Sequence, residues 1–309
     1  MVLSIARMVI PVVCTFLLGC FCKQKKILSQ EGLFGIRSLV SNVLLPVTLF
    51  NAFFTAEYSA RIALTFGTVF FCCSLGLLAG FLLRHLAAPY GKFMPFLVTN
   101  FEGGMLGYAL YNLLYPGMTS TFAMADIGQT LSAHTVFLFA LVAVSGGNAS
   151  PLQTMKRAIR TPALIGSLLG VLLGILGLGK TVTAHPAGGI LTDLISFVTA
   201  PTSALILIIV GYDLSFRRDL MRPVGITMVI RFAVMVALVA ASYAVIFHFI
   251  PFEKPLFVAL LLAWSLPAPF IVPLYADVTG HADFISTTLS VQTILSILLF
   301  VAVAAYSLA

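Results

Sequence analysis

Charged residues are scarce in this sequence of 309 residues. Only 9% of the residues are Asp, Glu, Lys or Arg, whereas 60% are hydrophobic. Ordinary soluble domains contain about 25% charged and about 45–50% apolar residues. The composition therefore excludes a soluble domain and is typical of an integral membrane protein.

Groups that carry catalytic chemistry are missing as well. No set of His, Glu and Asp residues stands at metal-ligand spacing, and no nucleophile is paired with a base in the sequence pattern. The five cysteines have no metal-ligand partners nearby. We therefore expect neither an enzyme nor a bound metal or other cofactor.

Long apolar runs dominate the chain instead. The run from Leu164 to Leu178 is apolar on every face, which suits a helix in lipid and not the alternating pattern of a transmembrane β-barrel. A membrane-crossing helix needs about 20 mainly apolar residues. The sequence predicts an all-α integral membrane protein with ten spans, over 3–22, 33–55, 61–83, 93–114, 121–145, 161–179, 189–211, 224–249, 256–275 and 284–307.

The basic residues indicate the orientation in the lipid bilayer. Twelve of the 17 Lys and Arg follow the first, third, fifth and seventh predicted spans: Lys23, Lys25, Lys26, Arg37, Arg84, Lys92, Lys156, Arg157, Arg160, Arg217, Arg218 and Arg222. Because basic loops stay cytosolic, the sequence predicts a multi-pass protein of the cytoplasmic membrane with both termini outside. The net charge of +7 then reflects orientation, and no nucleic-acid partner is expected.

Similar segments recur in the same order in the two halves of the chain. The matching groups are Pro11 with Leu17-Leu18-Gly19 and Pro162 with Leu168-Leu169-Gly170, then Pro46 and Pro201, then Thr130-Leu131-Ser132 and Thr288-Leu289-Ser290. We infer two halves of five spans each, over residues 1–146 and 161–309, joined by a cytosolic linker at 147–160. Because five is odd, the second half is inverted in the membrane, as in the repeats of secondary transporters.

Two predicted spans contain matching interruptions. Gly103-Gly104 and Gly107 interrupt the fourth span, and Pro267 and Pro269, with Pro273 beyond them, interrupt the ninth. Glycine lowers the cost of unwinding and proline removes an amide donor, so backbone groups are freed halfway through both helices. Such groups must be buried in protein or line a wet cavity, and in secondary transporters they form the substrate site.

Four ionisable residues lie inside predicted spans: Glu102, Asp126, His134 and Arg231. Each costs about 2.5–3.5 kcal/mol on insertion and is therefore a functional candidate. Because burial disfavours a charged carboxylate, Glu102 is a candidate to carry a proton, with Asp126 and His134 as further candidates. Alternatively, Glu102 pairs with Arg231 or His134, or meets a cationic group of a substrate. Structural roles stay open for Asp126 and Arg231, which can reach the two membrane interfaces.

The predicted substrate site consists of residues at or near the two interruptions. They are Asn42, Asn100, Glu102, Gly103, Gly104, Gln129, His134, Ser265, Pro267 and Pro269. Interhelical hydrogen bonding is the alternative role for the polar residues, because membrane bundles use such contacts routinely.

These features resemble the auxin efflux carrier family. The stretch Asn100-Phe101-Glu102-Gly103-Gly104-Met105-Leu106-Gly107 resembles the family's fourth-span crossover, Pro267-Ala268-Pro269 its ninth span, and Thr288-Leu289-Ser290-Val291-Gln292-Thr293 its last span. The resemblance covers the whole chain. It implies a scaffold of spans one, two, six and seven, an elevator-type transport unit made of the other spans, homodimerisation through the scaffold, and a small organic anion bound at the crossover.

The family's plant exporters bind substrate through an asparagine, a glutamine and a tyrosine that align with Glu102, Gln129 and His134. Two of these positions therefore differ, and Ala109 replaces the usual proline after the crossover glycine. These departures point away from auxin itself. Because an ionised Glu102 would repel a carboxylate that a protonated Glu102 accepts, they favour proton coupling.

The expected function is secondary active transport of a small organic anion, auxin-like or malate-like, by alternating access. A sodium-coupled carrier similar to the bile acid symporters is one alternative, disfavoured because the ninth span offers only Trp264, Ser265 and carbonyl groups to a cation. A sensor that does not transport is the other, because a protein can keep a fold without its activity.

Overall fold

The computed structural model describes residues 2–56, 58–145, 160–185, 188–272 and 278–309. Every regular element within these ranges is a helix. Most of the predicted linker at 147–160, with Lys156 and Arg157, lies outside the described residues, and so does Pro273.

Seven helical segments in the described ranges are long and apolar enough to cross a membrane. They comprise α1 (Val2–Gln24); α2 (Gln30–Leu39), η1 (Val40–Leu44) and α3 (Leu45–Phe54); α4 (Ala60–Leu83); α7 (Thr119–Ser132), η5 (Ala133–Phe137) and α8 (Leu138–Ser145); α12 (Gly188–Thr199) and α13 (Thr202–Asp213); α14 (Met221–Phe249); and α17 (Ala282–Leu308). They coincide with predicted spans one, two, three, five, seven, eight and ten. The described part of the chain is thus all-helical and has the segments of a multi-pass membrane protein.

The other three predicted spans coincide with shorter or interrupted helices. The fourth consists of α5 (Met94–Val98), the π-helical turn η4 (Gly103–Gly107) and α6 (Tyr108–Leu114); the sixth of α10 (Pro162–Ile175), followed by α11 (Leu178–Ala184); and the ninth begins with α15 (Lys254–Ser265). At about 1.5 Å per residue, α15 covers only about 18 Å of a hydrocarbon core about 30 Å thick. The complete ten-span topology stays a prediction.

Two tightly packed helix pairs form one side of the bundle. α1 packs against α13, and α3 packs against α10, so the pairs join span one with seven and span two with six. A Cβ on Gly211 would meet Phe16 O at 2.0 Å, and a Cβ on Gly170 would meet Phe50 O at 2.6 Å. Small residues permit such close approach of backbones in membranes.

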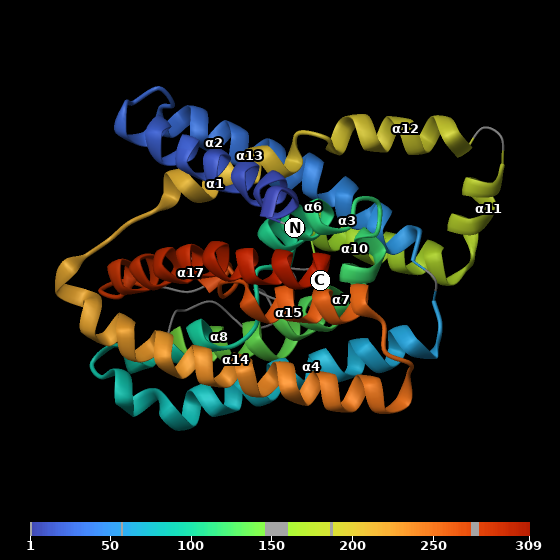
Figure 1. Ribbon diagram of the computed structural model, residues 1–309. Coiled ribbons are helices and arrows are strands. Elements are labelled where there is room, and N and C mark those ends of the chain that lie inside the picture. Colours follow the sequence, from blue (N-terminus) through green and yellow to red (C-terminus); the bar gives the residue numbers. More distant parts are fainter. Residues whose placement is uncertain (1, 57, 146–159, 186–187, 273–277) are drawn as a thin grey trace.

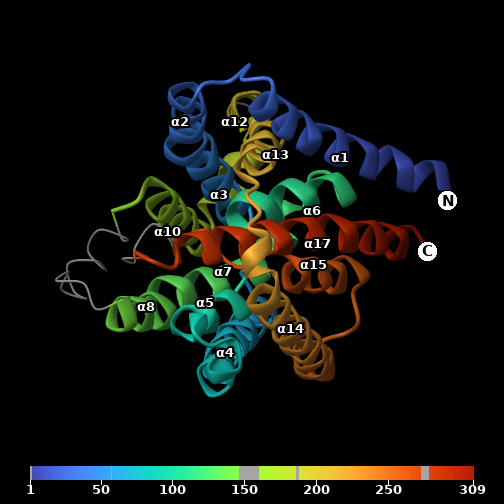
Figure 2. The same cartoon turned by 90° about the vertical axis from the view of Figure 1, so that its left-hand side faces the viewer.

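The opposite edge of the bundle is formed by α4 and α14, which pack against each other. Figures 1 and 2 show these two helices on one edge, α1, α2 and α13 on the other, and α7, α15 and α17 between them. The largest cluster of buried apolar residues extends from α1 through α7 and α15 to α17, and it includes Phe101 and Trp264 beside the two helix interruptions. The interruptions therefore lie in the interior of the protein.

Loops that are predicted to share a side of the membrane contact one another. At one end, Lys23 Nζ donates to Leu214 O at 2.6 Å, Lys92 Nζ donates to Ser145 O at 3.2 Å, and Arg217 pairs with Asp283 at 2.8 Å. An ion pair between Arg61 and Glu253 joins the loops after spans two and eight. The grouping of loops matches the predicted orientation, while the choice of the cytosolic end stays a prediction.

Candidate functional site

The first helix interruption lies between α5 and η4. The helix α5 ends at Val98, and the backbone of Thr99–Glu102 is irregular before the π-helical turn begins at Gly103. Asn100 adopts a left-handed conformation with φ of 53°, which asparagine tolerates better than most residues. The Thr99 hydroxyl donates to Cys73 O on α4 at 2.8 Å. The chain thus leaves the helix at Thr99, before the glycines that mark the break in the sequence.

The second interruption follows α15. The helix ends at Ser265, and the backbone of 266–269 has no regular structure. Pro267 and Pro269 are both buried there, and neither can donate the amide hydrogen bond that a continuing helix requires.

The two interruptions bond directly to each other. The amide of Glu102 donates to Pro267 O at 2.8 Å, and the amide of Phe270 donates to Glu102 Oε2 at 2.8 Å. Glu102 therefore contacts the ninth-span break through both its backbone and its carboxylate. We call the segments 99–103 and 266–270 together the crossover.

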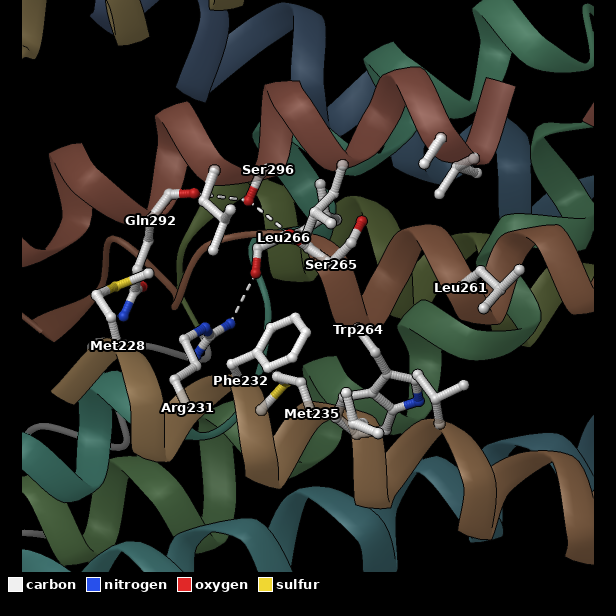
Figure 3. Close-up of a pocket in the computed structure, with 16 residues that line it drawn as sticks. Met228, Arg231, Phe232, Met235, Leu261, Trp264, Ser265, Leu266, Gln292 and Ser296 are labelled. Carbon is white, nitrogen blue, oxygen red and sulfur yellow. Dashed lines mark hydrogen bonds between the residues drawn. The ribbon is translucent and has the colours of Figure 1, made fainter. Parts of the chain in front are cut away.

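Arg231 on α14 joins the same two segments from one side. Its guanidinium is 4% exposed and donates to four carbonyl oxygens, with Nη1 bonded to Leu97 O at 3.0 Å and Thr99 O at 3.3 Å, and Nη2 bonded to Asn100 O at 3.0 Å and Leu266 O at 2.7 Å. Figure 3 shows the bond to Leu266. These carbonyls lie at the carboxyl ends of α5 and α15, where helix dipoles favour a cation. Arg231 is thus a buried cation whose recorded hydrogen bonds all go to backbone carbonyl groups.

Three further side chains satisfy backbone groups that the interruptions release. Gln292 on α17 donates to Leu97 O at 2.7 Å and accepts from the Ala268 amide at 2.8 Å, while Ser296 Oγ donates to Ser265 O at 2.6 Å. Gln129 on α7 donates to Phe101 O at 2.7 Å. Gln292 and Ser296 are four residues apart on one face of α17, a spacing from which the sequence indicates that both face the same neighbour, but not that this neighbour is the crossover.

Asp126 on α7 lies against the start of η4. Its side chain is 1% exposed, and a Cβ on Gly103 would lie 1.9 Å from Asp126 Oδ1. The only residue that can occupy position 103 without displacing this carboxyl group is glycine. The sequence pattern placed Gly103 at the break but did not reveal this contact.

The other predicted site residues lie at different distances from the crossover. Asn100 is buried within it, and its amide nitrogen has no hydrogen-bond partner among the described residues. Gly104 faces Leu45 on α3, with ordinary contact distances of 3.7–4.0 Å for an added Cβ. His134 lies in η5, about two turns beyond Asp126, and its Nδ1 is 2.8 Å from Thr130 O. Asn42 is exposed and its amide donates to Ser38 Oγ at 3.0 Å, so no contact recorded for it reaches the crossover.

A pocket of about 240 Å³ reaches the crossover from the side of α14, α15 and α17. Figure 3 shows Arg231, Gln292 and Ser296 among apolar residues that include Met235, Leu261 and Trp264. Phe232 and Val236, which also line the pocket, are about half exposed on the surface of α14. The polar groups at the end of this pocket are those that hold the two interruptions together.

Comparisons with known proteins indicate the class of protein to which this geometry belongs. No known family model matches the sequence. A protein of Methanothermobacter thermautotrophicus named as an uncharacterized transporter is 27% identical over 299 residues, and the match covers 94% of each chain. The chain has a transporter homologue. Together with its apolar helices, this similarity supports a membrane transporter.

Proposed function

We propose that the protein is a secondary active transporter that moves a small organic anion, a mono- or dicarboxylate, by alternating access. The observation that carries this proposal is the crossover, where two interrupted helices bond to each other inside the bundle through Glu102, Pro267 and Phe270. Secondary transporters bind substrate where discontinuous helices of two related halves meet.

The electrostatics of the crossover suit a carboxylate that arrives with a proton. Arg231 supplies a buried cation, and the start of η4 directs the positive end of a helix dipole toward Glu102 and Asp126. These two acids would repel an anionic substrate as long as both are ionised. Substrate binding is therefore favoured when a proton neutralises one of them, which supports proton coupling.

The packing of the helices supports a division into scaffold and transport unit. The close pairs α1–α13 and α3–α10 contain the predicted scaffold spans one, two, six and seven. The crossover belongs to the remaining helices and meets the scaffold near Gly104 and Leu45. We infer an elevator-type carrier with the architecture of the auxin efflux carrier family, which dimerises through its scaffold.

Flux measurements in proteoliposomes test this function. Purified protein should exchange a labelled carboxylate such as malate, malonate or a monocarboxylate, with saturation by the unlabelled acid. The same ligands should raise the melting temperature in detergent, because they bind only the native state. Sodium-dependent uptake would favour the symporter alternative, and a ligand-induced thermal shift without flux would favour a sensor.

Variants at Gly104 distinguish a blocked substrate site from an unfolded protein. An alanine at this position makes only ordinary contacts of 3.7–4.0 Å with Leu45 and Glu102, so Gly104→Ala should fold, while the larger Gly104→Phe fills the space beside the crossover. Flux should fall at least tenfold in Gly104→Phe. Gly67→Phe on α4 is the matched control, because open space surrounds Gly67. Equal flux in the two phenylalanine variants would contradict the placement of the site.

A further inference from the structure

Asp126 is a deeply buried acid whose hydrogen bonding is incomplete. Its Oδ2 accepts from Thr130 Oγ1 at 3.5 Å, the outer limit of a hydrogen bond, and its Oδ1 has no partner within the described part of the chain. An ionised carboxylate enclosed in this way lacks the donors that would compensate its lost hydration. The neutral acid is the form that such surroundings favour.

A buried hydroxyl, that of Tyr108, lies beside Asp126. Tyr108, the first residue of α6, lies with its hydroxyl next to the carboxyl group of Asp126, yet that hydroxyl has no hydrogen bond of normal geometry to any described residue. A protonated Asp126 could donate to Tyr108 Oη. After the proton leaves, Tyr108 could donate to the carboxylate instead, so a hydrogen bond between the two side chains can form whether Asp126 is protonated or ionised.

The other groups around Asp126 do not replace it as a proton carrier. Glu102 approaches it from the crossover and Cys73 from α4, and Arg231 lies beyond Cys73, with its charge held by four carbonyls. The helix α3 has no titratable residue, and the titratable residue of α15, Lys254, lies at its first position. Tyr58, which precedes α4 and lies near Tyr108, stays neutral because burial raises its pKa to about 12.

The other two candidate proton carriers have defined partners. The carboxylate of Glu102 accepts the Phe270 amide at 2.8 Å, and a hydrogen bond donated by an amide favours the ionised form of a carboxylate. The ring of His134 bonds to Thr130 O at 2.8 Å through Nδ1, away from the crossover. Among the three, Asp126 is the residue whose carboxyl oxygen lies against Gly103, where an added Cβ would be 1.9 Å from Oδ1.

We propose that Asp126 is the binding site for the proton that accompanies the substrate. This inference rests on the proposed transport function and assigns its coupling ion to a residue. An ionised Asp126 places a negative charge against Gly103 at the amino end of η4, where it competes with a substrate carboxylate for the helix dipole. Protonation of Oδ1 removes that competitor, and the substrate anion takes its place. Loss of the proton on the other side of the membrane restores the repulsion and releases the anion.

Infrared spectroscopy tests the protonation directly and does not depend on transport. At pH 7, wild type in detergent should show the carbonyl band of a buried carboxylic acid, and Asp126→Asn should lack it while Glu102→Gln keeps it. Asp193→Asn is the matched control, because Asp193 is exposed on α12. A wild-type spectrum without the band, or a band that persists in Asp126→Asn, would overturn the assignment.

Transport then tests the coupling. A pH gradient that is acidic on the substrate side should accelerate wild-type uptake severalfold, whereas uptake by Asp126→Asn, measured relative to its own rate without a gradient, should not respond. A full response in Asp126→Asn overturns the inference and leaves the transport function intact. Absence of flux in wild type at every pH instead defeats the proposed function, and the infrared band still decides whether Asp126 holds a proton.

Discussion

Replacing Arg231 by methionine should destabilise the protein more than any other single change at the crossover. Methionine has a similar length and is apolar, but it donates no hydrogen bond. The four bonds of 2.7–3.3 Å from Arg231 to Leu97, Thr99, Asn100 and Leu266 would all be lost. The two helix ends would then be joined only by their remaining bonds, which include those of Gln292 to Leu97 and Ala268.

The size of the effect follows from which carbonyls lose their donor. Leu97 O keeps the bond from Gln292 at 2.7 Å, so three carbonyls lose the donor that Arg231 provides. A buried acceptor without a partner costs about 1–3 kcal/mol, which gives about 3–9 kcal/mol in total. Removing a buried cation also removes its desolvation cost, which offsets part of this loss. We therefore expect the low end, about 3 kcal/mol, and a fall in melting temperature of at least about 5 °C.

The emission of Trp264 provides the assay. It is the single tryptophan of the chain, it is 2% exposed, and it lies at the end of α15 beside the second interruption. Thermal unfolding in detergent followed by this emission should show the loss in Arg231→Met and a smaller loss in Arg231→Lys, whose single ammonium group cannot span both segments. Arg222→Met is the control, because Arg222 is exposed on the same helix. If Arg231→Met and Arg222→Met melt at the same temperature, the argument that Arg231 holds the crossover together is refuted.

Three other substitutions have outcomes that follow from contacts in the structure. Gly103→Ala places a Cβ 1.9 Å from Asp126 Oδ1 and so displaces this carboxyl group, and we expect the acceleration of uptake by a pH gradient to be lost in proteoliposomes; a full response would show that Asp126 need not lie against η4. Gly170→Ala forces α10 away from Phe50 O and should lower the free energy of unfolding by about 1–3 kcal/mol. Gly225→Ala, with open space around it, should leave the free energy of unfolding unchanged. Equal melting temperatures of the two variants would contradict the close pairing of α3 and α10. Glu102→Gln keeps an oxygen that can accept the Phe270 amide, so its melting temperature should stay within a few degrees of wild type, and its uptake should still respond to a pH gradient. Loss of that response would indicate that Glu102, and not Asp126, binds the coupled proton.

The sequence predicts the positions of the helices well because long apolar runs leave few alternatives in a membrane. It also predicts where the helix of the ninth span is interrupted, since Pro267 and Pro269 cannot continue a helix. The fourth span differs in detail. Its helix ends at Val98 and turns at Asn100, whereas the glycines lie in the π-helical turn that follows. Glycine composition marks the region of a break, but the turning point depends on tertiary bonds such as that from Thr99 to Cys73.

The partners of the polar residues could not be predicted from the sequence. Spacing along a helix indicates which side chains share a face, but not which backbone groups of another segment they meet. Arg231 was expected either to pair with Glu102 or to reach the membrane interface, and the four bonds recorded for its guanidinium end on carbonyl oxygens instead. Carbonyl groups occur at every position of a chain, so no residue type marks a position as the acceptor of such a bond.

Because the recorded bonds of Arg231 end on main-chain oxygens, the positions that it contacts should tolerate substitution better than position 231 itself. Every amino acid carries a carbonyl group, so the positions of Leu97 and Leu266 can exchange side chains, within the limits of packing, without losing their bonds to the guanidinium. Position 231 has no such latitude, because no other side chain supplies donors in two directions to both segments. A library of variants selected for folding should therefore accept several apolar residues at 97 and 266 and retain only arginine at 231.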